Sequence, residues 1–326
     1  MKILVLGAAG MIGRKLIEKL LAKGSLRGEP LTHIHAFDVV TPAFSDTGSI
    51  EVSCQAGDIT DPSTVDALVD SQPDVIFHLA AIVSGEAEAD FDKGYRINLD
   101  GTMNLFNAII SREGYTPRVV YASSIAVFGA PFPETIEDDF HLTPLTSYGT
   151  QKAIGELLLA DYTRKGHMDG VGLRFPTIVV RPGKPNAAAS GFFSNIIREP
   201  LSGKKAILPV SKDVLHWAAS PRSAVHFCIH AAELDGEKIG PRRNLTLPGL
   251  AITVGGMIEA LERVAGKKAV DLIEEQPDQS IIDIVKNWPR QFNAERAESL
   301  GFQAEKTFDE IIQAHINDEL GGQLPG

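Results

Sequence analysis

The chain of 326 residues lacks most features that mark secreted, metal-binding or disulfide-stabilised proteins. It has two cysteines, Cys54 and Cys228, and neither lies in a C-x-x-C or mixed Cys/His spacing. We therefore expect two reduced structural thiols. His226 and His230 are four positions apart, but no glutamate base and no third ligand accompany them, so we expect no metal site there.

Basic residues and long apolar runs are also scarce. The chain has 31 Lys and Arg against 42 Asp and Glu, a formal net charge of −11, which argues against nucleic acid or an anionic membrane surface as a partner. No apolar stretch reaches the length of a membrane span, and no cleavable leader is recognisable, so we expect a cytoplasmic protein. Hydrophobic residues make up 44% of the chain, which is enough for a sizeable core.

The most informative pattern lies near the N-terminus. Residues 2–6 are apolar and β-branched, which predicts a buried strand, and residues 11–23 repeat apolar side chains at helical spacing. Between them, Gly7, Gly10 and Gly13 form the pattern G-x-x-G-x-x-G. We expect Gly7 to allow the turn, Gly10 to bring backbone N–H groups close to a pyrophosphate, and Gly13 to let the helix pack against the sheet. The segment therefore predicts dinucleotide binding at a helix N-terminus.

Acidic and small residues follow at the ends of later predicted strands. Residues 32–40 alternate into a second strand that contains Asp38, roughly 20 residues past the glycines, where a carboxylate accepts hydrogen bonds from the adenosine ribose. Such a carboxylate repels the 2′-phosphate of NADP, so we expect NAD as the cofactor. Residues 73–81 predict a strand that runs into Ala80 and Ala81, whose small side chains let a cofactor lie against the backbone.

Two further segments supply candidate catalytic groups. One predicted strand ends in Ser123 and Ser124, and the next predicted helix carries Tyr148 and Lys152 on one face. An ammonium beside a phenol favours the phenolate, so we expect the pKa of Tyr148 to fall below its usual value of about 10. Such a tyrosine exchanges a hydroxyl proton as a general acid or base, while a serine hydroxyl holds the same substrate oxygen.

Taken in order, these motifs resemble the extended short-chain dehydrogenases, the nucleotide-sugar epimerase/dehydratase family. The resemblance is specific over residues 1–185 and looser to the end of the chain. It implies an α/β fold, a Rossmann-type doubly wound parallel sheet with a smaller C-terminal substrate lobe, and a homodimer formed through two helices. It assigns Ser124, Tyr148 and Lys152 as the catalytic triad, with Ser123 as the neighbouring candidate.

The same resemblance assigns the cofactor and substrate residues. The residues expected to line NAD are Gly7, Gly10, Met11, Ile12, Gly13, Asp38, Asp58, Ile59, Leu79, Ala80, Ala81, Asn98, Ala122, Tyr148, Lys152, Phe175, Pro176 and Ile178. An anionic substrate needs a cationic partner, and an acidic chain must supply it locally with individual arginines. The residues expected to contact substrate are Ser84, Ser124, Tyr148, Arg181 and Arg222.

We expect two parts in the chain. Residues 1–182 form the NAD-binding Rossmann domain with the triad, and residues 183–326 form mainly a substrate-binding lobe, of which about 213–235 returns to the Rossmann core. The stretch H-L-A-A-I-V-S-G-E-A-E, beginning at His78, resembles family members that oxidise C2 of a four-carbon sugar acid with NAD. The expected partner is therefore a small anionic sugar acid.

Three alternatives stay open at this stage. Sugar-nucleotide epimerases usually carry a strand that ends in R-x-x-N-x-x-G-P. Pro176 and Thr177 stand in the region where those enzymes have the asparagine, which counts against an epimerase. An enzyme like L-threonine dehydrogenase has a similar size. A redox-sensing regulator would bind NAD without chemistry, but such proteins usually lose the tyrosine or the lysine, and both are intact here.

Overall fold

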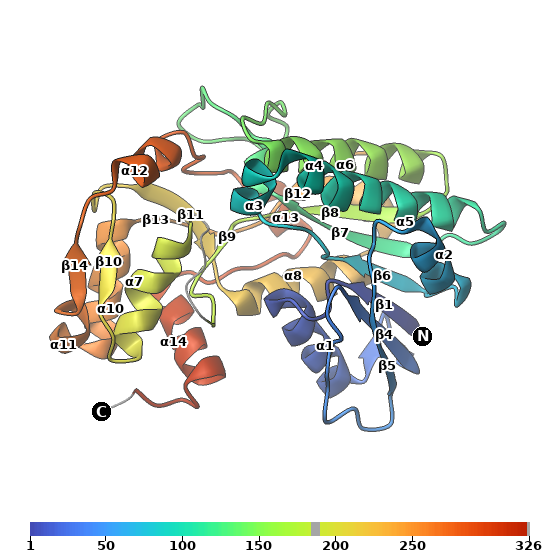
Figure 1. Ribbon diagram of the computed structural model, residues 1–326, viewed down its shortest axis with the longest axis horizontal. Helices are drawn as coiled ribbons and strands as arrows, with labels where there is room; N and C mark the ends of the chain where they lie inside the picture. Colours follow the sequence, from blue (N-terminus) through green and yellow to red (C-terminus); the bar gives the residue numbers. More distant parts are fainter. Residues whose placement is uncertain (184–189, 325–326) are drawn as a thin grey trace.

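A seven-stranded parallel sheet forms the centre of the computed structural model, which describes residues 1–183 and 190–324 (Figure 1). In order across the sheet, the strands are β5 (Glu51–Ala56), β4 (His33–Asp38), β1 (Lys2–Leu6), β6 (Val75–His78), β7 (Arg118–Ser124), β8 (Asp169–Phe175) and β12 (Asn244–Thr246). β1 pairs with β4 on one side and with β6 on the other, so the strand order reverses there. This confirms the predicted doubly wound fold and places the switch point, where such sheets bind ligands, at β1 and β6.

Helices cover both faces of the sheet, as Figure 1 shows. They are α1 (Met11–Lys23) and α8 (Pro221–Glu233) on one face, and α2 (Pro62–Asp70), α5 (Gly101–Ile110) and α6 (Ser147–Arg164) on the other. Side chains along β1 alternate between these faces. Ile3 and Val5 join the core under α1 and α8, whereas Leu4 and Leu6 join the core under the other three helices. Burial on both faces explains the continuous apolar sequence of this strand.

A smaller second part has a core of its own, made of residues such as Phe193, Leu261 and Ile312. Its strands are β9 (Thr177–Ile178), β10 (Ala206–Leu208), β11 (Leu215–Ala219), β13 (Leu250–Thr253) and β14 (Ile273–Glu275). Its main helices are α7 (Gly191–Leu201), α10 (Val254–Ala265), α11 (Lys267–Val270), α12 (Gln279–Val285) and α14 (Phe308–Glu319). From within this half of the sequence, α8 packs against β7 and β8, and β12 extends the large sheet.

The pattern over residues 90–112 predicts one long helix, and the chain is helical from Phe91 to Ile110, but with a π turn in the middle that the pattern does not predict. The segment consists of α4 (Phe91–Gly94), a π-helical turn (Tyr95–Asp100) and α5. Asn98 lies in this π-helical turn, and its side chain is buried, with 2% of its surface exposed. The inserted residue of a π turn has no signature in hydrophobic spacing, so the periodicity of the sequence gives no sign of it.

A small hairpin before β4 has no counterpart among the predicted elements. It pairs β2 (Ser25–Leu26) with β3 (Glu29–Pro30), and the two turn residues, Arg27 and Gly28, have φ values of 55° and 79°. Both lie in the left-handed region, which two-residue hairpin turns require. The remaining short elements are α3 (Ser84–Ala89), the 3-10 turn η2 (Ile125–Val127), α9 (Gly236–Ile239) and α13 (Glu295–Ser299). Within the ranges that the structure describes, no helix is both long enough and apolar enough to cross a membrane.

Candidate active site

The three glycines join β1 to α1 in a turn that packs backbone against backbone. Gly7 has a φ of +91°, and a Cβ placed there would lie 2.7 Å from the backbone nitrogen of Ala80. A Cβ on Gly13 would overlap the carbonyl oxygen of Gly7, so only glycine lets α1 approach the turn. Gly10 is the N-cap of α1 and makes no side-chain cap. The N–H groups at the start of this helix therefore point into a site that suits an anion, with Met11 and Ile12 in the first turn.

Asp38 faces this turn from the end of β4. Its Oδ2 accepts a hydrogen bond from Ala9 N at 2.9 Å, and its Oδ1 accepts one from Val39 N at 2.6 Å. Two backbone donors thus fix the carboxylate beside the glycine turn. A fixed carboxylate in this place suits the hydroxyls of an adenosine ribose and opposes a 2′-phosphate.

The other expected cofactor residues follow the carboxyl ends of the central strands. Asp58 and Ile59 lie after β5, where Ile59 packs against Gly101 at the start of α5. Leu79, Ala80 and Ala81 continue from β6, and Leu79 N still donates to Leu6 O at 2.9 Å. The remaining residues are Ala122 in β7, Phe175 at the end of β8, Pro176, and Ile178 in β9. The ends of β4, β5, β6, β7 and β8 that carry expected cofactor residues therefore lie at one edge of the large sheet, whereas Ile178 belongs to the separate three-stranded sheet.

Ser124, Tyr148 and Lys152 lie at this same edge. Ser124 ends β7, and its Oγ accepts a hydrogen bond from Ala126 N at 3.1 Å. Tyr148 and Lys152 occupy the first two turns of α6, and Nζ of Lys152 lies 5.8 Å from the centroid of the Tyr148 ring. Ser123 is buried on the other side of the strand and donates to Glu156 Oε1 at 2.5 Å. The geometry therefore favours Ser124 over Ser123 as the serine of the site.

Burial sets the proton affinities of this site. It raises the pKa of Tyr148 to about 12, although the Ser124 hydroxyl lowers it in part. It also lowers the pKa of Lys152 to about 8, and the carboxylate of Glu156 opposes this shift. The expected fall in the pKa of Tyr148 is thus absent in this structure, because desolvation is the largest cause of the shift and raises the pKa.

Asn98 ties the loop after β6 to the catalytic helix. Its Nδ2 donates to Gln151 Oε1 at 2.7 Å and to Ile82 O at 3.2 Å, and its Oδ1 accepts from Ile82 N at 2.9 Å. Gln151 precedes Lys152 on α6 and is fully buried. This network links the loop after β6 to α6, which carries Tyr148 and Lys152.

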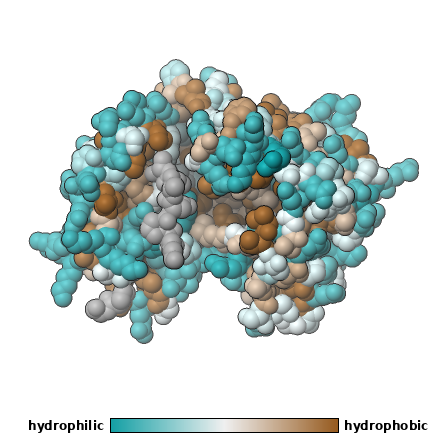
Figure 2. Space-filling view, viewed as in Figure 1, coloured by the Kyte–Doolittle hydropathy of each residue, from teal (hydrophilic) through white to brown (hydrophobic). Residues whose placement is uncertain are grey.

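The expected substrate residues differ in their surroundings. Arg222 is half exposed and pairs with Asp318 through Nη2 and Oδ1 at 2.6 Å. Arg181 has no carboxylate within ion-pair distance in the described ranges, and burial together with Arg198 lowers its pKa. Ser84 opens the short helix α3. Arg181 is therefore the arginine more available to bind an anionic substrate. Figure 2 shows that the surface of the molecule is hollowed between its two parts.

The sequence does not predict the buried polar contact between His216 and Thr177. His216 in β11 is 2% exposed, and its Nε2 lies 2.6 Å from Thr177 Oγ1. Its ring stacks on Phe193 with centroids 4.5 Å apart, and burial lowers its pKa to about 3, so it is neutral. The partners of His216, Thr177 and Phe193, are distant from it in the sequence, so a local pattern does not predict these contacts. The only sign in the sequence is that Thr177 replaces the asparagine of the epimerases.

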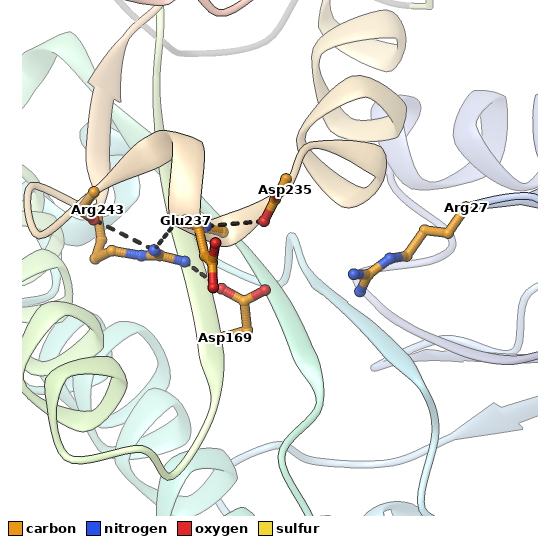
Figure 3. Close-up of a pocket in the computed structure, with 7 residues that line it drawn as sticks. Arg27, Asp169, Asp235, Glu237 and Arg243 are labelled. Atoms are coloured by element: carbon orange, nitrogen blue, oxygen red, sulfur yellow. Dashed lines mark hydrogen bonds and ion pairs between the residues drawn. The ribbon is translucent and has the colours of Figure 1, made fainter.

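A second hollow lies at the opposite, amino edge of the sheet. It has a volume of about 410 Å³ and is lined by Arg27, Asp169, Asp235, Gly236, Glu237, Gly240 and Arg243 (Figure 3). Arg243 and Arg118 pair with the two oxygens of Asp169, the latter at 2.6 Å. None of the candidate cofactor or catalytic residues lines this hollow, so it is separate from the candidate active site.

Comparison with known proteins agrees with this arrangement. The sequence model of the NAD dependent epimerase/dehydratase family matches residues 3–218. The chain is 48% identical over 323 residues to D-erythronate dehydrogenase of Cupriavidus necator, with 98% of each chain covered. It is 40% identical over 320 residues to D-erythronate dehydrogenase of Haemophilus influenzae, which covers 98% of this chain and 100% of that one.

A solved structure is also similar over the full chain. The nucleoside-diphosphate-sugar epimerase from Agrobacterium tumefaciens is 60% identical, with a TM-score of 0.97, and the match covers 100% of this chain and 96% of that one. The fold and the order of the elements described above are therefore shared with this solved structure.

Proposed function

Because the chain belongs to the NAD dependent epimerase/dehydratase family, we propose that it oxidises D-erythronate to 2-oxo-D-erythronate with NAD. The observation that carries this proposal is the 48% identity to D-erythronate dehydrogenase of Cupriavidus necator over 98% of both chains. The candidate active site adds the groups that an alcohol oxidation needs, a base and a hydroxyl donor beside a dinucleotide site.

In the proposed reaction, Tyr148 is the general base. It removes the proton of the C2 hydroxyl while the hydrogen on C2 leaves as hydride, and the C2 oxygen becomes a carbonyl. NAD, when bound, supplies the acceptor for that hydride. Ser124 holds the reacting oxygen by a hydrogen bond, and the Lys152 ammonium stabilises the phenolate form of Tyr148.

The cofactor and the substrate would be held by opposite charges. We propose that the N–H groups after Gly10 hold the pyrophosphate and that Asp38 holds the adenosine ribose. Arg181 is proposed to bind the substrate carboxylate, because it is partly buried and has no acidic partner in the described ranges. Arg222 stays a second candidate, which would have to leave Asp318 first.

We further propose a role for each part of the chain and a homodimer. Residues 1–182 bind NAD and carry the triad, and residues 183–326 mainly bind substrate. The proposed homodimer forms through α5 and α6, which expose Ile110 at 40% and Leu157 at 64%. Large apolar side chains on neighbouring helices are typical of such an interface.

A second candidate function has one observation in its favour. The Agrobacterium tumefaciens protein, 60% identical to this chain, is described as a nucleoside-diphosphate-sugar epimerase. Against it stands Thr177, paired with the buried His216, at the position where epimerases of this family have an asparagine. An epimerase would also act on a much larger substrate and would return the hydride to it, so it would produce no net NADH.

One assay separates the candidates. NADH formation is followed with NAD and a panel of D-erythronate, other four-carbon sugar acids, L-threonine and UDP-sugars, beside the Tyr148→Phe variant. NADH formation on D-erythronate that the variant loses supports the proposal. Interconversion of UDP-sugars without NADH formation would establish the epimerase instead, and NADH formation on L-threonine alone would establish a threonine dehydrogenase.

A further inference from the structure

Tyr121 lies beside the catalytic lysine and has no part in the mechanism above. It belongs to β7, and its side chain is 0% exposed in the core between the sheet and α6. Its hydroxyl makes no hydrogen bond of normal geometry in the described parts of the chain, although the nearby Thr102 hydroxyl lowers its pKa in part, and it rests against Gly155, where a Cβ would overlap it. A buried hydroxyl without a partner is unfavourable, so the hydroxyl does not explain why an aromatic ring stands here.

The ring of Tyr121, by contrast, faces a buried charge. Nζ of Lys152 lies 4.9 Å from its centroid, closer than the 5.8 Å to the Tyr148 ring. Lys152 is 2% exposed, and in the described ranges no carboxylate lies within ion-pair distance of its Nζ. A ring face within about 6 Å attracts a cation, and the attraction is strongest where water is excluded.

We propose that Tyr121 is a positioning residue for Lys152, because the face of its ring holds the ammonium beside Tyr148. This inference rests on the proposed function, which gives Lys152 the task of stabilising the phenolate. A carboxylate in the same place would hold the ammonium more strongly, but its own charge would oppose the phenolate. An aromatic ring attracts the cation without adding a competing anion.

Among the described residues, the other titratable groups around Lys152 are neutral or are paired with other groups, although the Glu156 carboxylate raises the pKa of Lys152 in part. His78 of β6 is neutral, because burial and Lys152 lower its pKa to about 3. Glu156, one turn along α6, is paired with Arg174 through Oε2 and Nη2 at 2.8 Å and accepts from Ser123. Tyr148 is the group that the ammonium serves. The ring of Tyr121, unlike Glu156, is not paired with another charged group and is free to stabilise the ammonium.

The experiment varies the ring face without changing its shape. Tyr121→Phe removes only the unpartnered hydroxyl, and phenylalanines with one, two or three ring fluorines at this position then weaken the ring face step by step. The pKa of Lys152 is read by NMR from lysine labelled with ¹³C at Cε and assigned with Lys152→Met. This reading needs neither substrate nor cofactor, so it stays informative if the chain does not oxidise D-erythronate.

We expect Tyr121→Phe to leave the pKa of Lys152 unchanged. Each added fluorine should lower the pKa of Lys152, by about one unit over the whole series, and one unit is a tenfold change in the protonation equilibrium. In turnover, the alkaline limb of the pH profile should move to lower pH by the same amount. Phe106→Leu, in the same core cluster, is the packing control, expected to lower the melting temperature and to leave the limb in place. A pKa of Lys152 that does not change along the fluorine series would overturn the inference.

Discussion

At the amino edge of the sheet two buried arginines share one carboxylate, whereas at the carboxyl edge one buried lysine has no carboxylate within ion-pair distance among the residues that the structure describes. Asp169 pairs with Arg118 through one oxygen and with Arg243 through the other. The arginines also donate to main-chain carbonyls, from Arg118 Nε to Ala231 O at 3.1 Å and from Arg243 Nε to Gly170 O at 2.7 Å. The charges of these three residues are paired or hydrogen-bonded, as structural charges are in folded proteins.

Some buried polar atoms near the carboxyl edge have no hydrogen-bond partner among the described residues. In the described ranges, His78 Nδ1 and Gln151 Nε2 are buried with no hydrogen-bond partner, and Gly10 caps α1 with no side chain. Burial shifts the pKa of Tyr148 up and that of Lys152 down. The two edges thus predict opposite consequences of mutation, with stability lost at the amino edge and activity lost at the carboxyl edge.

The largest effect should come from the proposed base. Tyr148→Phe keeps the ring and removes the group that takes the proton, so turnover should fall by about three to four orders of magnitude. Folding should be unaffected, because over residues 1–183 and 190–324 the phenol oxygen has no side-chain contact recorded except that with Ser124. Steady-state kinetics and a melting curve on the same preparation test both halves. If Tyr148→Phe melts well below the parent, mutations at the carboxyl edge reduce stability as well as activity, and the two edges do not differ in the way proposed.

The mirror experiment is at the amino edge. Asp169→Asn leaves two buried guanidinium groups without their shared counter-charge, so the free energy of unfolding should fall by about 3 kcal/mol. Denaturant titration measures this loss. Below the melting transition, turnover per folded molecule should match the parent, because the ion pairs lie at the edge away from the candidate site. A large loss of turnover in the folded variant would show that the edges are coupled.

The cofactor end of the carboxyl edge gives a smaller effect. Asp38→Ser removes the carboxylate that opposes a 2′-phosphate, so the preference of kcat/KM for NAD over NADP should fall by about tenfold or more. Asp58→Ser, which alters a carboxylate on the neighbouring strand end, is the control and should leave the preference nearly unchanged. If both variants behave alike, the choice between the cofactors does not depend on Asp38.

Much of this edge could be predicted from residue order alone. Gly7, Asp38, Ser124 and Tyr148 each follow or open a periodic element, and parallel strands bring their carboxyl ends together, so local patterns sufficed. The pairing of Thr177 with His216 could not be predicted, because it joins strands far apart in the sequence. The π turn at Asn98 also gave no signal. The shifts in pKa depend on how much water the folded chain excludes, which no local pattern records.

The smallest expected effect concerns the stability of the chain and tests whether the buried ammonium of Lys152 destabilises the fold. Lys152→Met removes an ammonium that burial destabilises, so the variant should be inactive yet more stable than the parent by about 1 kcal/mol at neutral pH. The pKa of Lys152 is about 8 in the folded chain against an ordinary value of 10.5, so between these values the unfolded chain binds more protons. The stability of the parent should therefore rise through this range, while the variant lacks that contribution.

Melting temperatures of both proteins from pH 7 to about 10.5 measure this difference, and other titrating groups cancel because the two chains share them. The gap should be widest below pH 8 and should close as the pH approaches 10.5. A parent that is the more stable protein at neutral pH would mean that Lys152 contributes to folding as the amino-edge arginines do. In that case the ring of Tyr121, 4.9 Å from Nζ, would compensate the whole cost of burying the charge.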